Sequence, residues 1–496
     1  MEPATYDAPM PKRWFRLAAL FLPAAVVVVL LAPFADVDPV DGFTFSNSPF
    51  TDEAWWLANA RNFAHFGYWS TDDWNLHLVS PVYSVLQAAA LAIGDVDMLS
   101  ARLMVVGTVS VTCLVLAFGL RGPFGARPAI LAATAYGSSV LVLYYGRLAY
   151  VEPVVALALV TGSLFVARVD DRRPWLWGLL GGGFLALAIG AKPTAIPLVA
   201  GLLGGLLLVE GRQSSWARRW TLGAGAVIIA MAVAWALLVL LPQREAVSVV
   251  GRILAEVTLP ADAGELLYRV LAYPVSNDLA LIYSIPLLLG GGAGVVLAWR
   301  QRESLPAPTR RLLVVAASWV LVGIVVLMVI PYRPNRYFLP LLPALAVLTA
   351  AALSLWPARA AGLPSRRSMS RVGLLVAGTA LTLPGLLLHA GWMWNGTRQL
   401  LPLQQQVAEA LPPGAVVEGA YGPLWAFRAP VTAIVSRPDS MVNGGDLYAT
   451  RGVRWIVTQP QAVPAWAAQH PAKWSARRTV LCHRWGREEL CLFNVP

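Results

Sequence analysis

Long apolar stretches recur along this 496-residue chain, and they constrain its fold more than any other feature. Each stretch has about 17 to 21 residues, close to the length that an α-helix needs to cross a hydrocarbon core of about 30 Å. The chain is 57% hydrophobic and only 13% charged, which suits a lipid environment. The pattern predicts an all-α polytopic membrane protein with about eleven transmembrane helices. These lie at 17–33, 98–119, 129–146, 153–167, 175–190, 193–209, 221–241, 279–299, 312–331, 338–356 and 372–390.

The net charge of +11 indicates a membrane topology rather than a nucleic-acid partner. With the N-terminus inside, half of the 38 Lys and Arg residues fall in the N-terminal segment and the short inner loops, as the positive-inside rule requires. The long loop 34–97, the loop 242–278 and the tail from 391 then face outward. The basic stretch 12–16 before the first span resembles a signal peptide, but ten further spans favour an uncleaved anchor. We expect a multi-pass protein of the cell inner or plasma membrane, with a cytoplasmic N-terminus.

A change in composition near residue 390 divides the chain into two parts. Residues 1–390 form the expected membrane body, which includes the outer loop 34–97. From residue 391 to residue 496 the long apolar runs stop, and short strand-like segments alternate with helix-like stretches. This alternation predicts a small extracytoplasmic, soluble α/β domain.

The end of this domain reads as a β-hairpin that contains two of the three cysteines. The strand-like segments 479–485 and 488–495 are joined by Gly486-Arg487, a pair suited to a tight hairpin turn. In that register Cys482 faces Cys491. A disulfide between them would suit an oxidising exterior, and two free thiols are the alternative.

Two acidic residues begin a helical pattern in the first outer loop. Asp52 and Glu53 follow Thr51, and apolar residues such as Trp56 and Ala60 continue at helical spacing, which is typical of an interfacial helix. The simplest interpretation is that the carboxylates complement the dipole of this helix. The alternative is a functional role, because acidic groups beside a membrane surface otherwise repel anionic lipid.

Other charged residues fall on the expected outer loops and turns. Such charges are costly close to a membrane and usually face a cavity, although a Lys or Arg side chain can also reach the interface harmlessly. Carboxylates such as Glu152 can orient and deprotonate a hydroxyl, whereas cations can hold a phosphate. The candidate phosphate-binding residues are Arg61, His77, Arg147, Lys192 and Arg336.

Four of these segments, in their order along the chain, resemble the GT-C glycosyltransferases. They are Thr51-Asp52-Glu53, the segment 80–83, the turn 147–152 and the string 336–343. The resemblance is to the protein O-mannosyltransferase and lipid A aminoarabinose transferase families in particular. It covers the membrane body, whereas the tail is matched only as a soluble outer domain.

The resemblance implies a GT-C fold and an inverting transfer of sugar from a polyprenyl-phosphate donor to a hydroxyl acceptor in the cell envelope. The acceptor would be a glycan, a lipid or a protein on the outer face. It further implies that Asp52 is the general base and that Glu53 and Glu152 support the acceptor. A divalent cation, Mg or Mn, would bind at Asp52 and Glu152 if one is used, and Arg336 with Tyr337 would bind the donor phosphate.

The chain also departs from the family pattern. Relatives often carry a Lys before a Pro-Pro pair where this chain has Ser80-Pro81, and His77 is the candidate substitute. The second acidic position is usually Asp, whereas here it is Glu152. The main alternative function is a multi-span transporter or lipid flippase, which predicts ionisable residues near the middle of spans. Most charges lie instead at the ends of the expected spans, and the abundance of Arg, Ala and Val suits a GC-rich bacterial genome.

Overall fold

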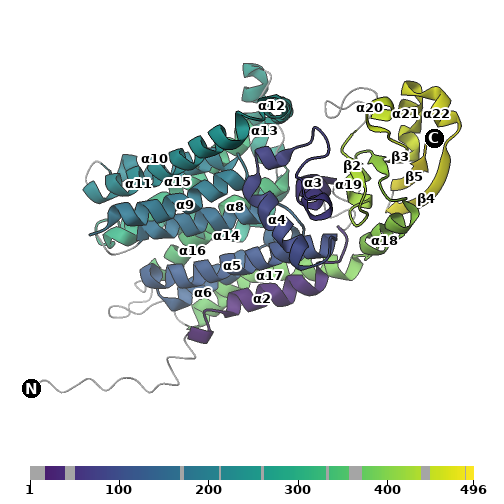
Figure 1. Ribbon diagram of the computed structural model, residues 1–496. Coiled ribbons are helices and arrows are strands. Elements are labelled where there is room, and N and C mark those ends of the chain that lie inside the picture. Colours follow the sequence, from purple (N-terminus) through teal and green to yellow (C-terminus); the bar gives the residue numbers. More distant parts are fainter. Residues whose placement is uncertain are drawn as a thin grey trace, which may run out of the picture.

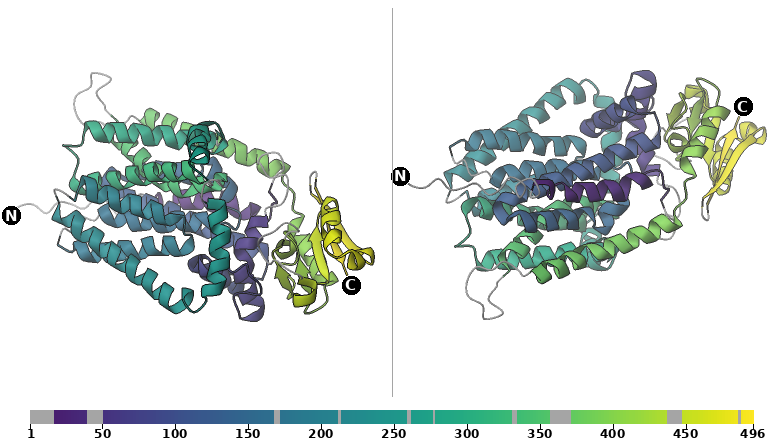
Figure 2. Two further views of the ribbon diagram at one scale, coloured as in Figure 1. Left: turned by 90° about the horizontal axis from the view of Figure 1, so that it is seen from above. Right: turned by 90° about the horizontal axis from the view of Figure 1, so that it is seen from below.

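A computed structural model of the protein describes residues 17–39, 51–167, 172–211, 214–258, 262–276, 278–330, 334–356, 371–436, 447–485 and 488–496. Figure 1 shows a bundle of long helices with a smaller domain of strands and short helices at one end of it. The two views in Figure 2 place this smaller domain at the same end. The basic stretch 12–16 and the expected hairpin turn Gly486-Arg487 lie outside the described residues.

Seven helical segments of the described chain are long and apolar enough to cross a membrane. They are α5 (Met98–Phe124), α9 (Pro174–Ala191), α11 (Ser215–Trp235) with its π-helical extension η4 (Ala236–Leu240), α14 (Asp278–Arg300), α15 (Ala307–Val329), the 3₁₀ segment η5 (Asn335–Leu341) with α16 (Leu342–Leu355), and α17 (Arg371–Asn395). Four shorter apolar helices accompany them. These are α2 (Leu22–Leu31) with η1 (Ala32–Phe34), α4 (Pro81–Ile93), α8 (Glu152–Leu164) with η3 (Phe165–Ala167), and α10 (Ala195–Val209). The prediction of a helical, multi-pass membrane body is therefore confirmed.

Each of the eleven predicted spans lies on helical structure, but the predicted span 129–146 is not one continuous helix. It is divided into α6 (Ala126–Gly137) and α7 (Val140–Tyr145) by Ser138 and by Ser139, whose backbone is extended. Helix α17 approaches this break so closely that a Cβ at Gly385 would lie 1.8 Å from the carbonyl oxygen of Ser138. The interruption thus makes room for a helix that comes much later in the chain.

Glycines allow α9 and α11 to pack closely. A Cβ at Gly178 would lie 2.3 Å from the carbonyl oxygen of Trp220, and one at Gly182 would lie 2.5 Å from the Cα of Ala224. Small residues at helix contacts are typical of membrane bundles, because lipid offers no hydrophobic drive for helices to associate. This contact fixes α9, and Lys192 lies directly at the C-terminal end of that helix.

Further helices lie at the end of the bundle that carries the C-terminal domain (Figure 1). The first outer loop contributes α3 (Thr51–Phe66) and the short 3₁₀ segment η2 (Leu76–Leu78). Between α11 and α14 the chain forms α12 (Arg244–Thr258) and α13 (Ala263–Ser276).

The C-terminal domain contains a five-stranded sheet with the order β2-β1-β3-β5-β4. The first three strands are parallel, and β5 pairs antiparallel with both β3 and β4. The predicted small α/β domain is therefore confirmed. Its elements are α18 (Leu400–Ala410), β1 (Val416–Glu418), α19 (Gly422–Trp425), β2 (Thr432–Ile434), α20 (Leu447–Arg451), β3 (Trp455–Thr458), η7 (Pro460–Ala462), α21 (Val463–Gln469), α22 (Pro471–Ser475), β4 (Arg478–Trp485) and β5 (Glu488–Asn494).

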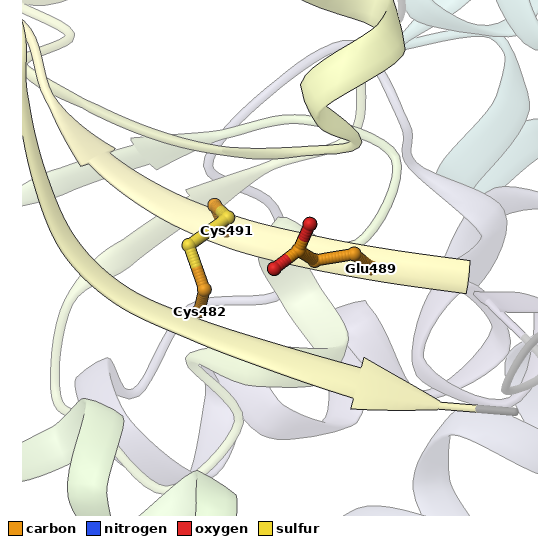
Figure 3. A group of neighbouring side chains, drawn as sticks. All are labelled: Cys482, Glu489 and Cys491. Carbon is orange, nitrogen blue, oxygen red and sulfur yellow. A yellow bond between two sulfur atoms is a disulfide. The ribbon is translucent and has the colours of Figure 1, made fainter. Parts of the chain in front are cut away.

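The hairpin register places Cys482 directly opposite Cys491, and the two form a disulfide (Figure 3). The third cysteine, Cys113, is a buried free thiol in α5. The register predicted from the two strand patterns is thus the observed one.

The membrane body and the C-terminal domain share one continuous hydrophobic core. Leu57 and Ala60 of α3 belong to the same cluster of buried residues as Trp425 and Phe427 of the domain. A second, smaller cluster lies within the domain and includes Trp466 and other residues packed around the sheet. The domain is therefore packed against the membrane body rather than connected to it only by the chain.

Candidate active site

Helix α3 places Asp52 in its first turn, next to a cation from a distant part of the chain. Arg336, in η5, donates a hydrogen bond from Nη2 to Oδ2 of Asp52 at 2.5 Å. The Asp52 side chain keeps 25% of its surface exposed, whereas the Arg336 side chain keeps 6%. A carboxylate that is partly accessible beside a buried cation is suited to meet a substrate.

Glu152 lies at the start of α8 and brings two cations together. Its Oε1 accepts a hydrogen bond from Nζ of Lys192 at 2.6 Å and lies 3.4 Å from Nε of Arg336. Arg336 therefore bridges the two carboxylates, Asp52 on α3 and Glu152 on α8. We call Asp52, Glu152, Lys192 and Arg336 the ion cluster.

Aromatic rings support both cations of the ion cluster. Nζ of Lys192 lies 3.9 Å from the ring centre of Tyr337 and 5.1 Å from that of Trp56. The guanidinium of Arg336 lies 4.8 Å from the ring centre of Tyr150. Such cation–π contacts stabilise a charge that has lost its water.

A small pocket of about 20 Å³, with room for about one water molecule, lies beside the ion cluster, between α10, α15 and the η5–α16 segment. Its polar end is formed by Glu152, Lys192 and Tyr337. Its remaining walls are mostly apolar and include Leu198, Val326, Leu327, Ile330, Pro340 and Leu341. The pocket thus joins a cationic end to an apolar surface within the membrane bundle.

Glu53 is not part of the ion cluster, because it forms a separate buried pair. Arg102 of α5 donates to both of its carboxylate oxygens, at 2.9 and 2.8 Å. Oε1 of Glu53 also accepts the backbone N–H of Ala149 at 2.8 Å, and the hydroxyl of Tyr83 donates to the carbonyl of Ala149 at 2.6 Å. Glu53 therefore holds the turn that leads into Glu152.

Arg147 and Arg61 also lie away from the ion cluster. Arg147 donates to the backbone carbonyls of Val37 and Asp38 and lies over the ring of Tyr144. Arg61 is buried against carbonyl groups of the C-terminal domain. Both guanidinium groups are buried and donate to backbone carbonyls, so this geometry does not favour the prediction that they bind a phosphate.

His77 belongs to an aromatic stack rather than to the ion cluster. Its ring is parallel to that of Trp69 at 4.1 Å, and it meets Trp235 edge to face at 5.9 Å. Burial lowers the pKa of His77 to about 4, so its imidazole is neutral at pH 7. A neutral imidazole is a poor phosphate ligand, so this arrangement does not favour the prediction that His77 is the substitute cation.

Ser80, where this chain departs from the family pattern, lies close to the end of the helix that leads to Lys192. The Ser80 hydroxyl donates to the carbonyl of Ala191, the residue directly before Lys192. The start of α4 thus lies against the end of α9. The backbone that carries Lys192 therefore lies beside the segment that begins at Ser80.

The ion cluster does not fit a divalent cation as its side chains are arranged. Asp52 and Glu152, the expected ligands, each contact a cationic side chain, and Arg336 and Lys192 would repel a further cation. The described residues contain one group of three side chains with metal-ligand spacing, in the hairpin, and two of its members are joined in the disulfide (Figure 3). That group is Cys482, Glu489 and Cys491.

Two residues of this region escaped the sequence analysis. Arg102 lies inside a predicted span, where a charged residue signals a buried partner, and that signal would have found it. Asp38 is buried and accepts hydrogen bonds from Thr397 and from the backbone N–H groups of Gln399 and Leu400. Nothing in the spacing of these residues indicates that they meet.

Comparison with known proteins defines the class to which this fold belongs. The structure has the fold of the GT-C class of membrane glycosyltransferases, as the resemblance predicted. ArnT from Cupriavidus metallidurans in the apo state superposes with a TM-score of 0.67 at 16% identity, covering 95% of this chain and 97% of that one. The same protein bound to undecaprenyl phosphate gives a TM-score of 0.66 at 15% identity, with 98% of each chain covered.

More distant structures share the fold over most of this chain. The oligosaccharyltransferase AglB from Archaeoglobus fulgidus matches 90% of this chain and 70% of its own, with a TM-score of 0.53 and 13% identity. The arabinofuranosyltransferase AftD from mycobacteria matches 98% of this chain and 40% of its own, with a TM-score of 0.52 and 18% identity. A family model, Dolichyl-phosphate-mannose-protein mannosyltransferase, matches residues 79–237. No curated protein matches the chain in sequence.

Proposed function

We propose that this protein is an inverting glycosyltransferase that moves a sugar from a polyprenyl-phosphate donor to a hydroxyl acceptor on the outer face of the membrane. The observation that carries the proposal is the ion cluster, in which Arg336 joins Asp52 to Glu152 beside a pocket with apolar walls. The fold supports the same conclusion, and the family model that matches residues 79–237 includes Glu152 and Lys192 in its range.

The lining of the pocket suits the two parts of the donor, although the pocket of about 20 Å³ would have to widen to admit it. The phosphate would lie at the polar end, held by Lys192 and Arg336 with Tyr337 beside them, since charge-assisted hydrogen bonds are the strong ones. The polyprenyl chain would lie against the apolar walls. ArnT, which is similar over nearly its whole length, was solved with undecaprenyl phosphate, and this supports a lipid of that kind.

Asp52 is proposed as the general base. It would take the proton of the acceptor hydroxyl while the oxygen attacks the anomeric carbon from the face opposite the phosphate. The new bond forms as the bond from the sugar to the phosphate oxygen breaks, so the configuration inverts. Lys192 and Arg336 would stabilise the negative charge that the departing polyprenyl phosphate acquires.

The donor would also change the partner of the base. In the structure Arg336 is hydrogen-bonded to Asp52 at 2.5 Å. A phosphate that takes over the guanidinium would leave the Asp52 carboxylate able to accept the acceptor proton. Glu152, which contacts both cations, would keep them in place during this exchange.

The proposed membrane orientation places the active site and the C-terminal domain outside the cell membrane and the N-terminus in the cytoplasm. The distribution of Lys and Arg supports this orientation. The disulfide between Cys482 and Cys491 supports it independently, because disulfides persist in oxidising compartments. The acceptor would be a glycan, lipid or protein of the cell envelope.

Sugar transfer by the purified full-length protein in lipid nanodiscs tests the proposal. A panel of radiolabelled polyprenyl-phosphate sugars is supplied to the wild type, to Asp52→Asn and to Asp95→Asn, a control in which an exposed carboxylate is removed. Label in free sugar or acceptor is expected with the wild type and the control, but not with Asp52→Asn. If no donor is consumed and another lipid or solute binds specifically, the result would instead support a transporter.

A further inference from the structure

We infer that the C-terminal domain completes the active site by fixing helix α3, with Arg61 as the positioning residue through which it orients Asp52. The inference rests on the proposed function, because it assigns a task to the base named there. According to this inference the domain contributes to each catalytic cycle, because it positions the proposed base.

The guanidinium of Arg61 is enclosed by the backbone of the C-terminal domain. Nε donates to the carbonyl of Phe427 at 3.0 Å, and Nη2 donates to three further carbonyls. These belong to Ala426 at 2.8 Å, Ala429 at 2.6 Å and Val431 at 2.9 Å. The remaining nitrogen, Nη1, donates to Oδ1 of the neighbouring Asn62 at 3.2 Å.

These contacts use the shape of arginine and not only its charge. Arg61 is 1% exposed, and its acceptors in the part of the domain that the structure describes are neutral carbonyl groups. Desolvation lowers the pKa of Arg61 to about 9, so the side chain is still charged at pH 7. A planar fork of N–H groups reaches several carbonyls at once, which the compact ammonium of a lysine does not.

The loop that receives Arg61 is itself well fixed. The N–H of Ala426 donates to Gly422, that of Ala429 to Ala426 and that of Val431 to Ala429, so the loop forms a compact turn. Its residues Phe427 and Ala429 are fully buried. Arg61 is therefore anchored to a rigid part of the domain.

A second contact lies closer to the base. Trp55 lies three residues after Asp52 on the same helix, and its Nε1 donates to the carbonyl of Ala420 at 2.8 Å. His65 contacts the carbonyl of Phe427 near the other end of α3. The domain thus holds α3 at three points along its length.

Helix α3 carries Asp52 at one end and Arg61 two and a half turns further on. A helix held at Arg61 and Trp55 has little freedom to tilt or rotate, so the Asp52 carboxylate keeps its direction when donor phosphate draws Arg336 away. A displacement of about 1 Å in a reacting group can cost about 100-fold in rate. The contacts to the domain therefore bear on turnover although they do not touch the substrate.

The test compares four full-length variants with the wild type in nanodiscs. Arg61→Met removes the guanidinium, Arg61→Lys keeps the charge but not the fork, and Trp55→Phe removes the indole N–H together with part of the ring system. Arg484→Met, on the exposed strand β4, is the matched control. Each protein is measured for kcat and donor KM, and for amide hydrogen exchange in α3.

For Arg61→Met we expect kcat to fall about 10- to 100-fold with donor KM within about twofold of the wild type, because the donor is held by other elements. Arg61→Lys should recover part of kcat, Trp55→Phe should lower kcat in the same direction, and the control should match the wild type. Exchange should speed up in α3 for both Arg61 variants but stay unchanged in α15.

Unchanged exchange in α3 for Arg61→Met would overturn the inference, whatever the activity. Faster exchange in α3 with an unchanged kcat would also overturn it, since α3 would then be held without consequence for the base. If Arg61→Met fails to fold, Arg61→Lys and Trp55→Phe decide the matter by the same two measurements. If the wild type transfers no sugar, the proposed function fails. The exchange measurement would still test whether the contacts with the C-terminal domain hold α3 in place.

Discussion

Arg336 donates a hydrogen bond to Asp52 at 2.5 Å although the two residues are 284 positions apart in the chain. The contact joins helix α3 of the first outer loop to the segment η5, which leads into α16. In the proposed mechanism the donor phosphate and the base would compete for this one guanidinium, and the first two predictions depend on that competition.

Replacement of the base should abolish turnover but keep donor binding. For Asp52→Asn we expect kcat to fall about 100- to 10,000-fold, the range that general-base catalysis contributes. Donor binding, measured by equilibrium dialysis with labelled donor, should stay equal or tighten because Arg336 loses a competing partner. Weaker donor binding would show that Asp52 helps to hold the phosphate.

Removal of the lysine should weaken donor binding. Lys192→Met takes one charge from the polar end of the pocket, while Glu152 keeps Arg336 as a partner at 3.4 Å. We expect donor KM to rise about 10- to 100-fold, since a hydrogen bond to a charged group is worth about 1.5–3 kcal/mol. Lys473→Met, in the C-terminal domain, is the control, and an unchanged KM for Lys192→Met would remove Lys192 from the phosphate site.

Glu53 and Arg102 should behave as a buried pair. Glu53→Gln leaves the Arg102 guanidinium buried without its carboxylate, so the free energy of unfolding should fall by about 3–5 kcal/mol. The double variant Glu53→Gln, Arg102→Met removes both charges and should be more stable than Glu53→Gln alone. Thermal unfolding in nanodiscs at a fixed lipid composition gives the comparison, and additive losses would contradict the pairing.

The disulfide should stabilise the C-terminal hairpin without affecting catalysis. Cysteines nine residues apart close a short loop, and removing such a link is expected to cost about 2–3 kcal/mol. Cys482→Ser with Cys491→Ser should therefore make the hairpin more sensitive to protease. In the part of the chain that the structure describes, the hydrogen bonds from α3 to the domain end on residues 420–431, so kcat should stay the same. A lower kcat would place the hairpin closer to the reaction than we expect.

Stability should fall as the pH is lowered from 7 to 4. Burial lowers the pKa of His77 and of His65 to about 4 each, whereas a histidine in the unfolded chain titrates near 6.5. Between these values the unfolded state binds more protons, so acid favours unfolding, while above pH 7 both states are neutral and the effect is absent. His77→Phe keeps a ring against Trp69 and should lose less in Tm between pH 7 and 5. An equal loss in Tm would mean that other groups cause it.

The membrane helices could be predicted because lipid imposes a local rule, in which every span must be apolar over a fixed length. The division of the span 129–146 could not be predicted, since it depends on the approach of α17 at Gly385. The sheet domain was recognisable from alternating strand patterns. Its contact with α3 was not, because backbone carbonyls that receive a side chain leave no mark in the sequence.

The same limit applies to the candidate site. The charges at the outer loops and turns included Lys192 and Arg336, which meet Glu152 in the structure, but the same criterion also selected Arg61 and Arg147. Only the tertiary partners separate these cations, since two lie against carboxylates and two against backbone carbonyls. Arg102 was not among the candidates although it is a charge inside the predicted span 98–119, and its partner in the structure is Glu53.

The shared core of α3 and the C-terminal domain has a consequence for the order in which the protein matures. The ribosome makes α3 early, but the carbonyl groups that receive Arg61 follow about 365 residues later, after all the membrane helices. The bundle can therefore be inserted while its outer helix still lacks its final support. Export and folding of the tail would then be the step that converts an inserted chain into an active one, so a defect in tail folding should leave protein in the membrane without activity.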